Sequence, residues 1–312
     1  MITRRKFAGA VLGVSIAGIA LESVGAFGKV VEASASSQRS GAGNADRIRQ
    51  QLAQIEAETG GRLGVAILDT ASGLHAGLRM DERFPMCSTF KLLAAAAMLA
   101  RTDRGQEDLQ RRILFSKADL LPNSPVTGEH TRERTGGAGM SVADLCNAAI
   151  TRSDNTAANL LLASFGGPAG LTAFARSVGD SVTRLDRIEP TLNEAIPGDP
   201  RDTTTPNAML GNLRELLLGE RLSASSREQL KAWLVANQTG DERIRAKLPK
   251  DWRVGDKTGT GDRGTANDVA ILWPPGRAPI LVSVYLTETS GNAKRNNAAI
   301  AKVGALVSAS LS

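Results

Sequence analysis

Cysteine and histidine are scarce in this sequence of 312 residues, which contains two of each. The cysteines form no C-x-x-C pair, so a metal centre would lack its usual ligands, and we expect neither a metal nor a cofactor. A histidine-dependent serine triad would have to use His75 or His130. His75 lies in an alternating segment and His130 in a glycine-rich region, and we expect both side chains to be solvated.

Aromatic residues make up only 4% of the chain, and no polybasic block accompanies its formal net charge of +6. Lysine and arginine are interleaved with aspartate and glutamate along the whole sequence. A nucleic-acid-binding surface needs clustered basic residues or stacking aromatic side chains. We therefore expect no nucleic-acid partner.

The N-terminal apolar stretch, Phe7–Leu21, is shorter than the roughly 20 residues that span a bilayer. It follows the paired arginines Arg4 and Arg5 and precedes a segment of small residues. These features predict a cleaved signal peptide of the twin-arginine type over residues 1–35, rather than a membrane anchor. The mature protein would begin near Ser36 and be exported, periplasmic or secreted, without stable membrane association.

Apolar periodicity predicts strands near both ends of the mature chain and helices between them. The expected segments are a helix over 45–61, a hairpin over 62–80, mostly helices over 88–218, a helix over 223–238, strands over 252–261, 266–275 and 278–288, and a helix over 292–311. This order predicts an α/β (α+β type) fold. An antiparallel sheet of about five strands is flanked by the terminal helices, and an all-helical subdomain is inserted.

We expect a single domain over residues 36–312, with a sheet-containing part over about 36–85 and 232–312 and a helical part over about 86–231. No repeat is visible, and nothing indicates more than a monomer. The segment 184–206 is poor in helix signals. A loop of this length in a compact domain is usually functional.

Ser88 and Lys91 stand at the head of an apolar run that meets no further charge before Arg101. Pro85 favours a helix start here, which places Ser88 in the first turn and Lys91 on the same face. A buried lysine with a lowered pKa can accept a serine proton. A capping serine beside a lysine whose amine reaches solvent would give the same local pattern.

Two later segments favour the catalytic interpretation. Ser153-Asp154-Asn155 precedes a helix, and Lys257-Thr258-Gly259 lies on a predicted strand. Ser-x-x-Lys, Ser-Asp-Asn and Lys-Thr-Gly, in that order, are the signature of class A β-lactamases and penicillin-binding proteins. The chain resembles a class A serine β-lactamase through nearly all of its mature length, including "DERFPMCSTFK", "NEAIPGDPRDTTTP" and "DKTGTGDRGTANDVAILWPP".

The resemblance implies a catalytic role for four residues in a site between the two parts of the fold. Ser88 would be the nucleophile that opens the lactam, and Lys91 its hydrogen-bonded partner and possible base. Ser153 would protonate the leaving nitrogen, and Glu189 would activate the deacylating water. The N–H groups of Ser88 and Thr260 would form the oxyanion hole. The implied substrate-binding residues are Asn123, Asn155, Asn193, Arg243, Lys257, Thr258, Gly259 and Thr260.

The long loop separates a hydrolase from a peptidase. By the resemblance, Glu189 and Asn193 hold the water against the acyl-enzyme, and Arg187 and Asp202 bridge the two ends of the loop. A cell-wall DD-peptidase or transpeptidase would lack this loop, and a penicillin-sensing domain would lack the proton-transfer set. The favoured function is therefore hydrolysis of penicillins and related antibiotics, with β-lactams as substrates, β-lactamase inhibitors as ligands and antibiotic resistance as the outcome.

Several positions depart from the family pattern. Many relatives have an arginine where this chain has Ala266, and Arg243 matches a site from which some members supply an equivalent guanidinium. Asn123 replaces a common aromatic at the mouth of the site. The segment Thr131–Gly139 is longer than expected and would form a flexible loop near the site entrance.

The cysteines depart as well. The family partner positions of Cys87 and Cys146 are occupied by Gly261 and Ala95. We therefore predict two free thiols.

Overall fold

The computed structural model describes residues 43–133 and 138–311. Residues 44–312 form one compact unit. The predicted signal peptide over residues 1–35 lies outside the described residues, as do residues 134–137 of the predicted loop over Thr131–Gly139.

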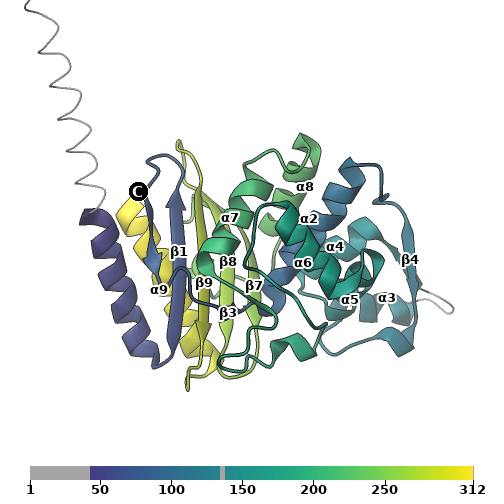
Figure 1. The fold of residues 1–312 in the computed structure, drawn as a ribbon, viewed down its shortest axis with the longest axis horizontal. Helices are drawn as coiled ribbons and strands as arrows, with labels where there is room; N and C mark the ends of the chain where they lie inside the picture. Colours follow the sequence, from purple (N-terminus) through teal and green to yellow (C-terminus); the bar gives the residue numbers. More distant parts are fainter. Residues whose placement is uncertain (1–42, 134–137, 312) are drawn as a thin grey trace, which may run out of the picture. The chain divides into compact units, whose positions relative to one another are not determined.

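A five-stranded antiparallel sheet lies at the centre of the compact unit, in the order β2-β1-β9-β8-β7 (Figure 1). Its strands are β1 (Arg62–Asp69), β2 (His75–Leu78), β7 (Arg253–Thr260), β8 (Ala266–Trp273) and β9 (Ile280–Thr287). β9 is buried along its whole length and β8 nearly so, as expected for strands covered on both faces. The hairpin and the three later strands predicted from the sequence are confirmed.

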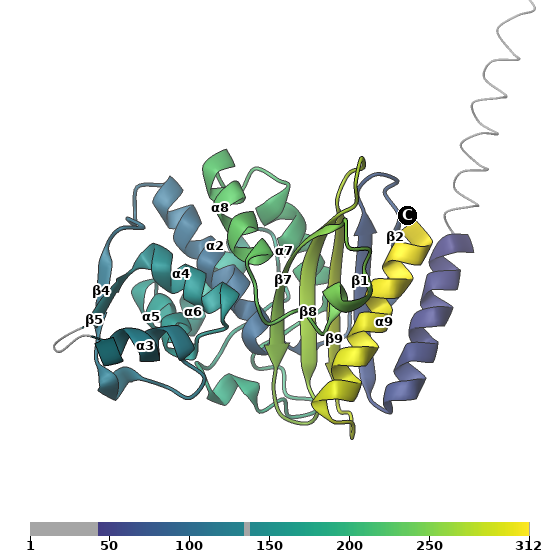
Figure 2. The ribbon, with the colours of Figure 1, turned by 180° about the vertical axis from the view of Figure 1, so that it is seen from behind.

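The two terminal helices cover one face of this sheet (Figures 1 and 2). They are the helix over residues 43–59 and α9 (Ala293–Leu311). Ile48 and Leu52 from the first helix and Ile300 and Val303 from α9 are buried in one apolar cluster with the strands. The prediction that helices from both ends of the mature chain flank the sheet is confirmed.

The other face carries α7 (Pro206–Leu217) and, beyond it, the helical part of the unit. Its helices are α2 (Phe90–Asp103), α3 (Pro125–Glu133), α4 (Val142–Thr151), α5 (Asn155–Ser164), α6 (Gly167–Ser177) and α8 (Ala224–Val235). Residues 90–100 of α2 are all buried, which explains why this helix is apolar on every side. α2 therefore forms a rigid support behind the residues at its N-terminus.

The middle of the chain is not purely helical. β4 (Arg112–Phe115) pairs with β5 (Ala138–Ser141), and β3 (Phe84–Pro85) pairs with β6 (Thr203–Thr204). These strands are two to four residues long, too short for a clear alternation in the sequence. The ends of the predicted Thr131–Gly139 loop belong to α3 and β5.

Among the described residues no single helix is long and apolar enough to cross a membrane. The bent pair α5–α6, with 74° between its helices, meets that test of length and composition.

Candidate active site

Ser88 lies in a 3-10 turn, Cys87–Thr89, that runs directly into α2. In such a first turn the backbone N–H groups have no acceptor within the helix. The turn is held from outside, because the side-chain amide of Asn267 donates to the carbonyl of Met86 at 3.0 Å. The Ser88 hydroxyl is nearly buried and donates to Oε1 of Glu189 at 3.1 Å.

The amine of Lys91 is buried among four oxygen atoms. It contacts Glu189 Oε1 at 3.0 Å, Asn155 Oδ1 at 2.7 Å, and the carbonyl and hydroxyl oxygens of Ser153 at 2.8 and 3.4 Å. Burial lowers the pKa of Lys91, and Glu189 opposes this shift. No hydrogen bond joins Lys91 directly to Ser88 among the described contacts, so the expected direct pair is replaced by a shared contact with Glu189.

Ser153 and Asn155 flank the N-terminus of α5. Asp154, between them, caps this helix by accepting from the N–H of Ala157 at 2.9 Å. Ser153 has a left-handed φ of 53°, a conformation unusual for a residue with a side chain. The turn points its hydroxyl toward the two buried amines, and the amide of Asn155 donates to the carbonyl of Pro122 at 2.9 Å.

Lys257 approaches Ser153 from the opposite wall, on strand β7. Its amine donates to the Ser153 hydroxyl at 3.1 Å and to the Thr258 carbonyl at 2.9 Å. Its side chain is fully buried. Burial and, next, the nearby Lys91 charge lower the pKa of Lys257 to about 7.

Glu189 reaches the site from the long loop and is 1% exposed. Its second oxygen, Oε2, accepts from the amide of Asn193 at 2.6 Å. Asn159 of α5 fixes the backbone of Glu189 in both directions, accepting from its N–H at 3.0 Å and donating to its carbonyl at 2.9 Å. The carboxylate is therefore held between Ser88, Lys91 and Asn193.

The two ends of the long loop are joined by Arg187 and Asp202. The guanidinium Nε donates to Asp202 Oδ2 at 2.6 Å, and the other carboxylate oxygen accepts the N–H groups of Asp186 and Arg187. The carbonyl of Asp202 also accepts from the N–H of Met86 at 2.9 Å. This closure therefore links the loop to the segment that carries Ser88.

A cavity of about 360 Å³ opens in front of these residues. Ser88 and seven of the eight predicted substrate-binding residues line it, whereas the eighth, Lys257, is buried outside its lining, as are Lys91 and Glu189. The lining consists of Ser88, Asn123, Arg152, Ser153, Asn155, Asn193, Thr239, Arg243, Thr258, Gly259 and Thr260. The structure thus brings every predicted site residue to one cavity or its immediate surroundings, with the loop-closing pair behind it.

The geometry agrees with comparisons to known proteins. A family model described as "Beta-lactamase enzyme family" matches residues 47–311. The chain is 47% identical to β-lactamase OXY-2 of Klebsiella oxytoca over 266 residues, covering 85% of this chain and 90% of that protein. It is 52% identical to β-lactamase AST-1 of Nocardia asteroides over 257 residues, covering 82% of this chain and 81% of that protein. An ancestral class A β-lactamase (GNCA) superposes with a TM-score of 0.81 at 65% identity, covering 83% of this chain and 98% of that structure.

The chain belongs to the class A serine β-lactamases. It is therefore a hydrolase of β-lactams, and this activity confers resistance to these antibiotics.

Arg243 of this β-lactamase is only 7% exposed and is held by four hydrogen bonds. It donates to the carbonyls of Gly259 at 2.7 Å and Asn267 at 2.6 Å, to Asn297 at 2.9 Å, and to the Thr260 hydroxyl at 2.7 Å. The guanidinium thus lies beside Thr260 on the cavity wall.

Both cysteines of the β-lactamase are free and buried, which confirms the predicted absence of a disulfide. Burial raises the pKa of both thiols. A Cβ atom built on Gly261 would lie 2.6 Å from the Cys87 sulfur, so the thiol packs against the end of β7.

No group of three metal-ligating side chains occurs among the described residues.

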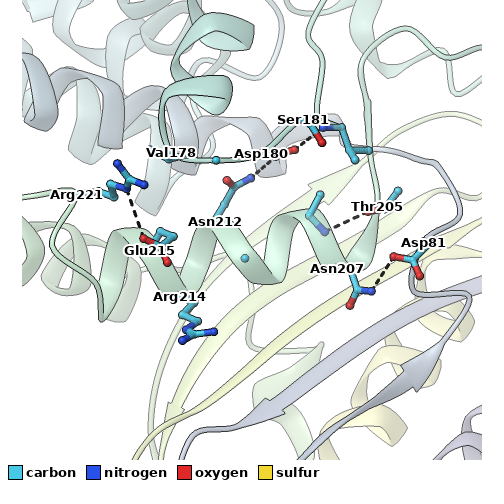
Figure 3. A pocket seen from close by; sticks show the side chains of 14 residues that line it. Asp81, Val178, Asp180, Ser181, Thr205, Asn207, Asn212, Arg214, Glu215 and Arg221 are labelled. Atoms are coloured by element: carbon cyan, nitrogen blue, oxygen red, sulfur yellow. Dashed lines mark hydrogen bonds and ion pairs between the residues drawn. The ribbon is translucent and has the colours of Figure 1, made fainter. Parts of the chain in front are cut away.

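A second cavity of about 490 Å³ lies elsewhere, between α7 and the segment 178–182 (Figure 3). Its polar groups are largely engaged with one another. Asn212 donates to Asp180 at 2.6 Å, Asn207 to Asp81 at 2.7 Å, and Arg221 pairs with Glu215 at 3.5 Å. This second cavity therefore lacks a buried serine in contact with buried lysine amines, which is what distinguishes the cavity at Ser88.

Sequence reasoning missed three residues of the site: Asn159, Thr239 and Arg152. Asn159 follows Asn155 by four residues, so the helical spacing could have placed it on the same face. Thr239 contacts Thr258 hydroxyl to hydroxyl at 2.5 Å across the cavity wall. Thr239 and Arg152 lie outside the three motifs, so no signal in the sequence pointed to either residue.

Proposed function

We propose that this β-lactamase hydrolyses its substrates through an acyl-enzyme on Ser88 that a water activated by Glu189 releases. The observation that carries this proposal is the shared contact at Glu189 Oε1, which touches both the Ser88 hydroxyl and the Lys91 amine. A single buried carboxylate thereby connects the nucleophile to a chain of proton-transfer groups.

Acylation begins when Ser88 Oγ attacks the lactam carbonyl carbon and loses its proton. The acceptor within hydrogen-bond distance is Glu189 Oε1. From there the contacts continue to the Lys91 amine at 3.0 Å and to the Ser153 hydroxyl at 3.4 Å. This arrangement supports a relay in which Glu189 gives a proton to Lys91 as Lys91 gives one to Ser153.

Ser153 completes the first half-reaction by donating its proton to the lactam nitrogen as the C–N bond breaks. The relay then leaves Ser153 and Lys91 reprotonated and Glu189 ionised. Lys257, at 3.1 Å from the same hydroxyl, favours this transfer by its positive charge when it is protonated. The net proton movement is from Ser88 to the ring nitrogen.

The oxyanion of the tetrahedral intermediate needs two donors. We assign them to the N–H groups of Ser88, in a first helical turn, and Thr260, at the end of an edge strand. Strand β7 has a neighbour on one side only, so the other side of its backbone is open to a ligand.

Deacylation uses Glu189 again, this time as the base for water. Asn193 donates to its Oε2, which leaves the carboxylate oriented toward the Ser88 ester. Asn155, with Asn193, would bind the acyl side chain, and Asn123 would contact the substrate at the mouth of the site. Thr258, Gly259 and Thr260, with Lys257 and Arg243, would bind the ring carboxylate.

Steady hydrolysis of nitrocefin tests the function. Wild type should turn over many equivalents, whereas Ser88→Ala should lose at least about a thousandfold in kcat. Ser164→Ala, a serine on α5 outside the cavity, serves as the matched control. A burst of one equivalent without steady turnover would instead favour the DD-peptidase alternative.

We also propose that the protein is exported as a monomer to the periplasm or the medium by the twin-arginine route. The paired arginines and the short apolar stretch of residues 1–35 support this. Replacing Arg4 and Arg5 by lysines should block export. Continued export of that variant would contradict the route.

A further inference from the structure

Arg152 is the one residue lining the catalytic cavity whose charge has no role in the proposed mechanism. It caps the C-terminus of α4 and immediately precedes Ser153. Its side chain is exposed, and its backbone N–H donates to the carbonyl of Ala148 at 3.1 Å. Within the described part of the chain its guanidinium has no hydrogen-bond or ion-pair partner.

Arg152 differs in this from the other arginine of the cavity. The Arg243 guanidinium donates four hydrogen bonds to protein oxygens, so its position is fixed before a ligand arrives. Arg152 can contact a ligand without giving up a protein partner. The described lining of the cavity contains these two arginines and no aspartate or glutamate, so it favours anionic groups at both places.

Backbone contacts place Arg152 at a defined end of the cavity. The carbonyl of Thr151 accepts from the N–H of Gln238, and the next residue, Thr239, contacts Thr258 at 2.5 Å. Arg152 therefore lies toward the Ser153, Thr239 and Thr258 end. Asn193 enters the lining from a different segment, the long loop, where it donates to Glu189 at 2.6 Å and where the acyl side chain would bind.

The neighbouring wall leaves space for a substituent. Asn123, a small and exposed residue with a left-handed φ of 59°, also lines the cavity, and its side-chain amide donates to the carbonyl of Ser153, the residue after Arg152, at 3.4 Å. No aromatic side chain occurs among the described lining residues. A group attached to the ring side of the substrate could thus reach the guanidinium.

We propose that Arg152 forms a second anion-recognising position, which favours β-lactams that carry an acidic group on the ring-side substituent in addition to the ring carboxylate. This inference rests on the proposed function for the orientation of the substrate. An exposed charge pair of this kind contributes modestly, which corresponds to about a fivefold preference.

A matched pair of cephalosporins tests the proposal. Cefotaxime and ceftriaxone share the acyl side chain and the ring system. They differ at C3, where ceftriaxone has an acidic triazine and therefore a second negative charge. Their apparent inhibition constants as competitors of nitrocefin hydrolysis can be compared whether or not either compound is hydrolysed rapidly.

Arg152→Gln should reduce the preference for ceftriaxone over cefotaxime about fivefold. Arg152→Lys should retain most of it, because the charge remains. Arg104→Gln is the matched control, since Arg104 is an exposed arginine that caps α2 as Arg152 caps α4 and lies outside the cavity lining. Arg104→Gln should leave the ratio at the wild-type value.

An unchanged ratio in Arg152→Gln would overturn the proposal, as would equal losses in Arg152→Lys and Arg152→Gln. An equal loss in Arg104→Gln would show that net charge, and not this position, sets the preference. Failure of the proposed function would be visible separately, as absence of nitrocefin hydrolysis by the wild type.

Discussion

Asp256 and Lys257 are adjacent on strand β7, and both side chains are fully buried, on opposite faces of the strand. The carboxylate of Asp256 has partners within the protein, because Arg245 donates to it at 2.5 Å and Asn237 at 2.7 Å. Lys257 has no carboxylate in ion-pair contact among the described residues, and its partners are the Ser153 hydroxyl and the Thr258 carbonyl. A buried charge is costly unless it is paired. Lys257, which lacks such a partner, lies behind the cavity lining, beside Ser153 and Thr258, where the charge of an anionic substrate would offset its own.

Of the changes on strand β7, Lys257→Met should have the largest effect on activity. Loss of the cation should lower kcat/KM for benzylpenicillin by about a hundredfold to a thousandfold, because a buried charge that contacts the substrate is removed. The same change should raise the free energy of unfolding by about 1 to 4 kcal/mol, because a desolvated cation is replaced by a side chain of similar size. Steady-state kinetics and urea denaturation measure the two effects.

The pH dependence of unfolding checks the physical cause. Burial lowers the pKa of Lys257 from its ordinary value of 10.5 to about 7, so between these pH values the unfolded chain binds one more proton than the native state. Stability contributed by this residue therefore rises with pH over that interval. The slope of the free energy of unfolding against pH should be smaller in Lys257→Met than in the wild type. It should be unchanged in Lys250→Met, an exposed control. A lower free energy of unfolding in Lys257→Met would contradict the claim that the buried, unpaired Lys257 destabilises the fold.

Asp256→Ala should have the opposite effects: a loss of stability and only a small loss of activity. Removing the carboxylate leaves Arg245 without its partner and should lower the free energy of unfolding by about 3 kcal/mol. The kcat/KM of the folded fraction should fall far less than in Lys257→Met. Asp251→Ala, an exposed carboxylate nearby, is the control. A free energy of unfolding equal to that of the wild type would show that the contacts of Asp256 with Arg245 and Asn237 do not stabilise the fold.

The activity profile should depend on the Lys257 proton. Because the pKa of Lys257 is about 7, kcat/KM, which reports the free enzyme, should decline as pH rises through this value. Lys257→Arg keeps its charge throughout this range and should lose the decline. An identical alkaline limb in Lys257→Arg would assign the titration to another group.

Much of this site could be predicted from sequence because its chemistry is written in short motifs. Ser88 and Lys91, Ser153 and Asn155, and Lys257 were found as three motifs in a fixed order, and their roles came from the family resemblance that this order carries. The resemblance also implied that Glu189 acts at Ser88 and that Arg187 and Asp202 close the loop, but the individual contacts of the Glu189 carboxylate could not be predicted. Glu189 Oε1 lies between Ser88 and Lys91 only because the long loop closes through Arg187 and Asp202.

Strand register was equally hidden. Thr258 pairs with Asp268 across β7 and β8, which brings a second buried carboxylate close to Asp256. The alternation of each strand predicts which residues share a face, but the pairing of two strands also depends on the turn between them. The buried acidic pair therefore became visible only in the structure.

Asp268→Asn should have the smallest effect. Burial and, next, the Asp256 carboxylate raise the pKa of Asp268 well above its usual range, which favours the neutral carboxyl over the carboxylate. Asparagine is neutral too and can still accept from the N–H of Ile244, which Asp268 Oδ2 does at 3.1 Å. The free energy of unfolding should change by less than about 1 kcal/mol, whereas Asp268→Ala should lose about 1 to 3 kcal/mol. Equal losses in both variants, measured by urea denaturation, would place a charge on Asp268.

The central claim is that Ser88 is acylated and that Glu189 is needed for release. Time-resolved mass spectrometry of Glu189→Ala with benzylpenicillin tests it most directly, with Glu194→Ala, an exposed carboxylate on the same loop, as control. We expect a covalent adduct on the peptide that contains Ser88, and this adduct should persist in Glu189→Ala and disappear in Glu194→Ala. Rapid full turnover by Glu189→Ala, or an adduct on another peptide, would contradict it.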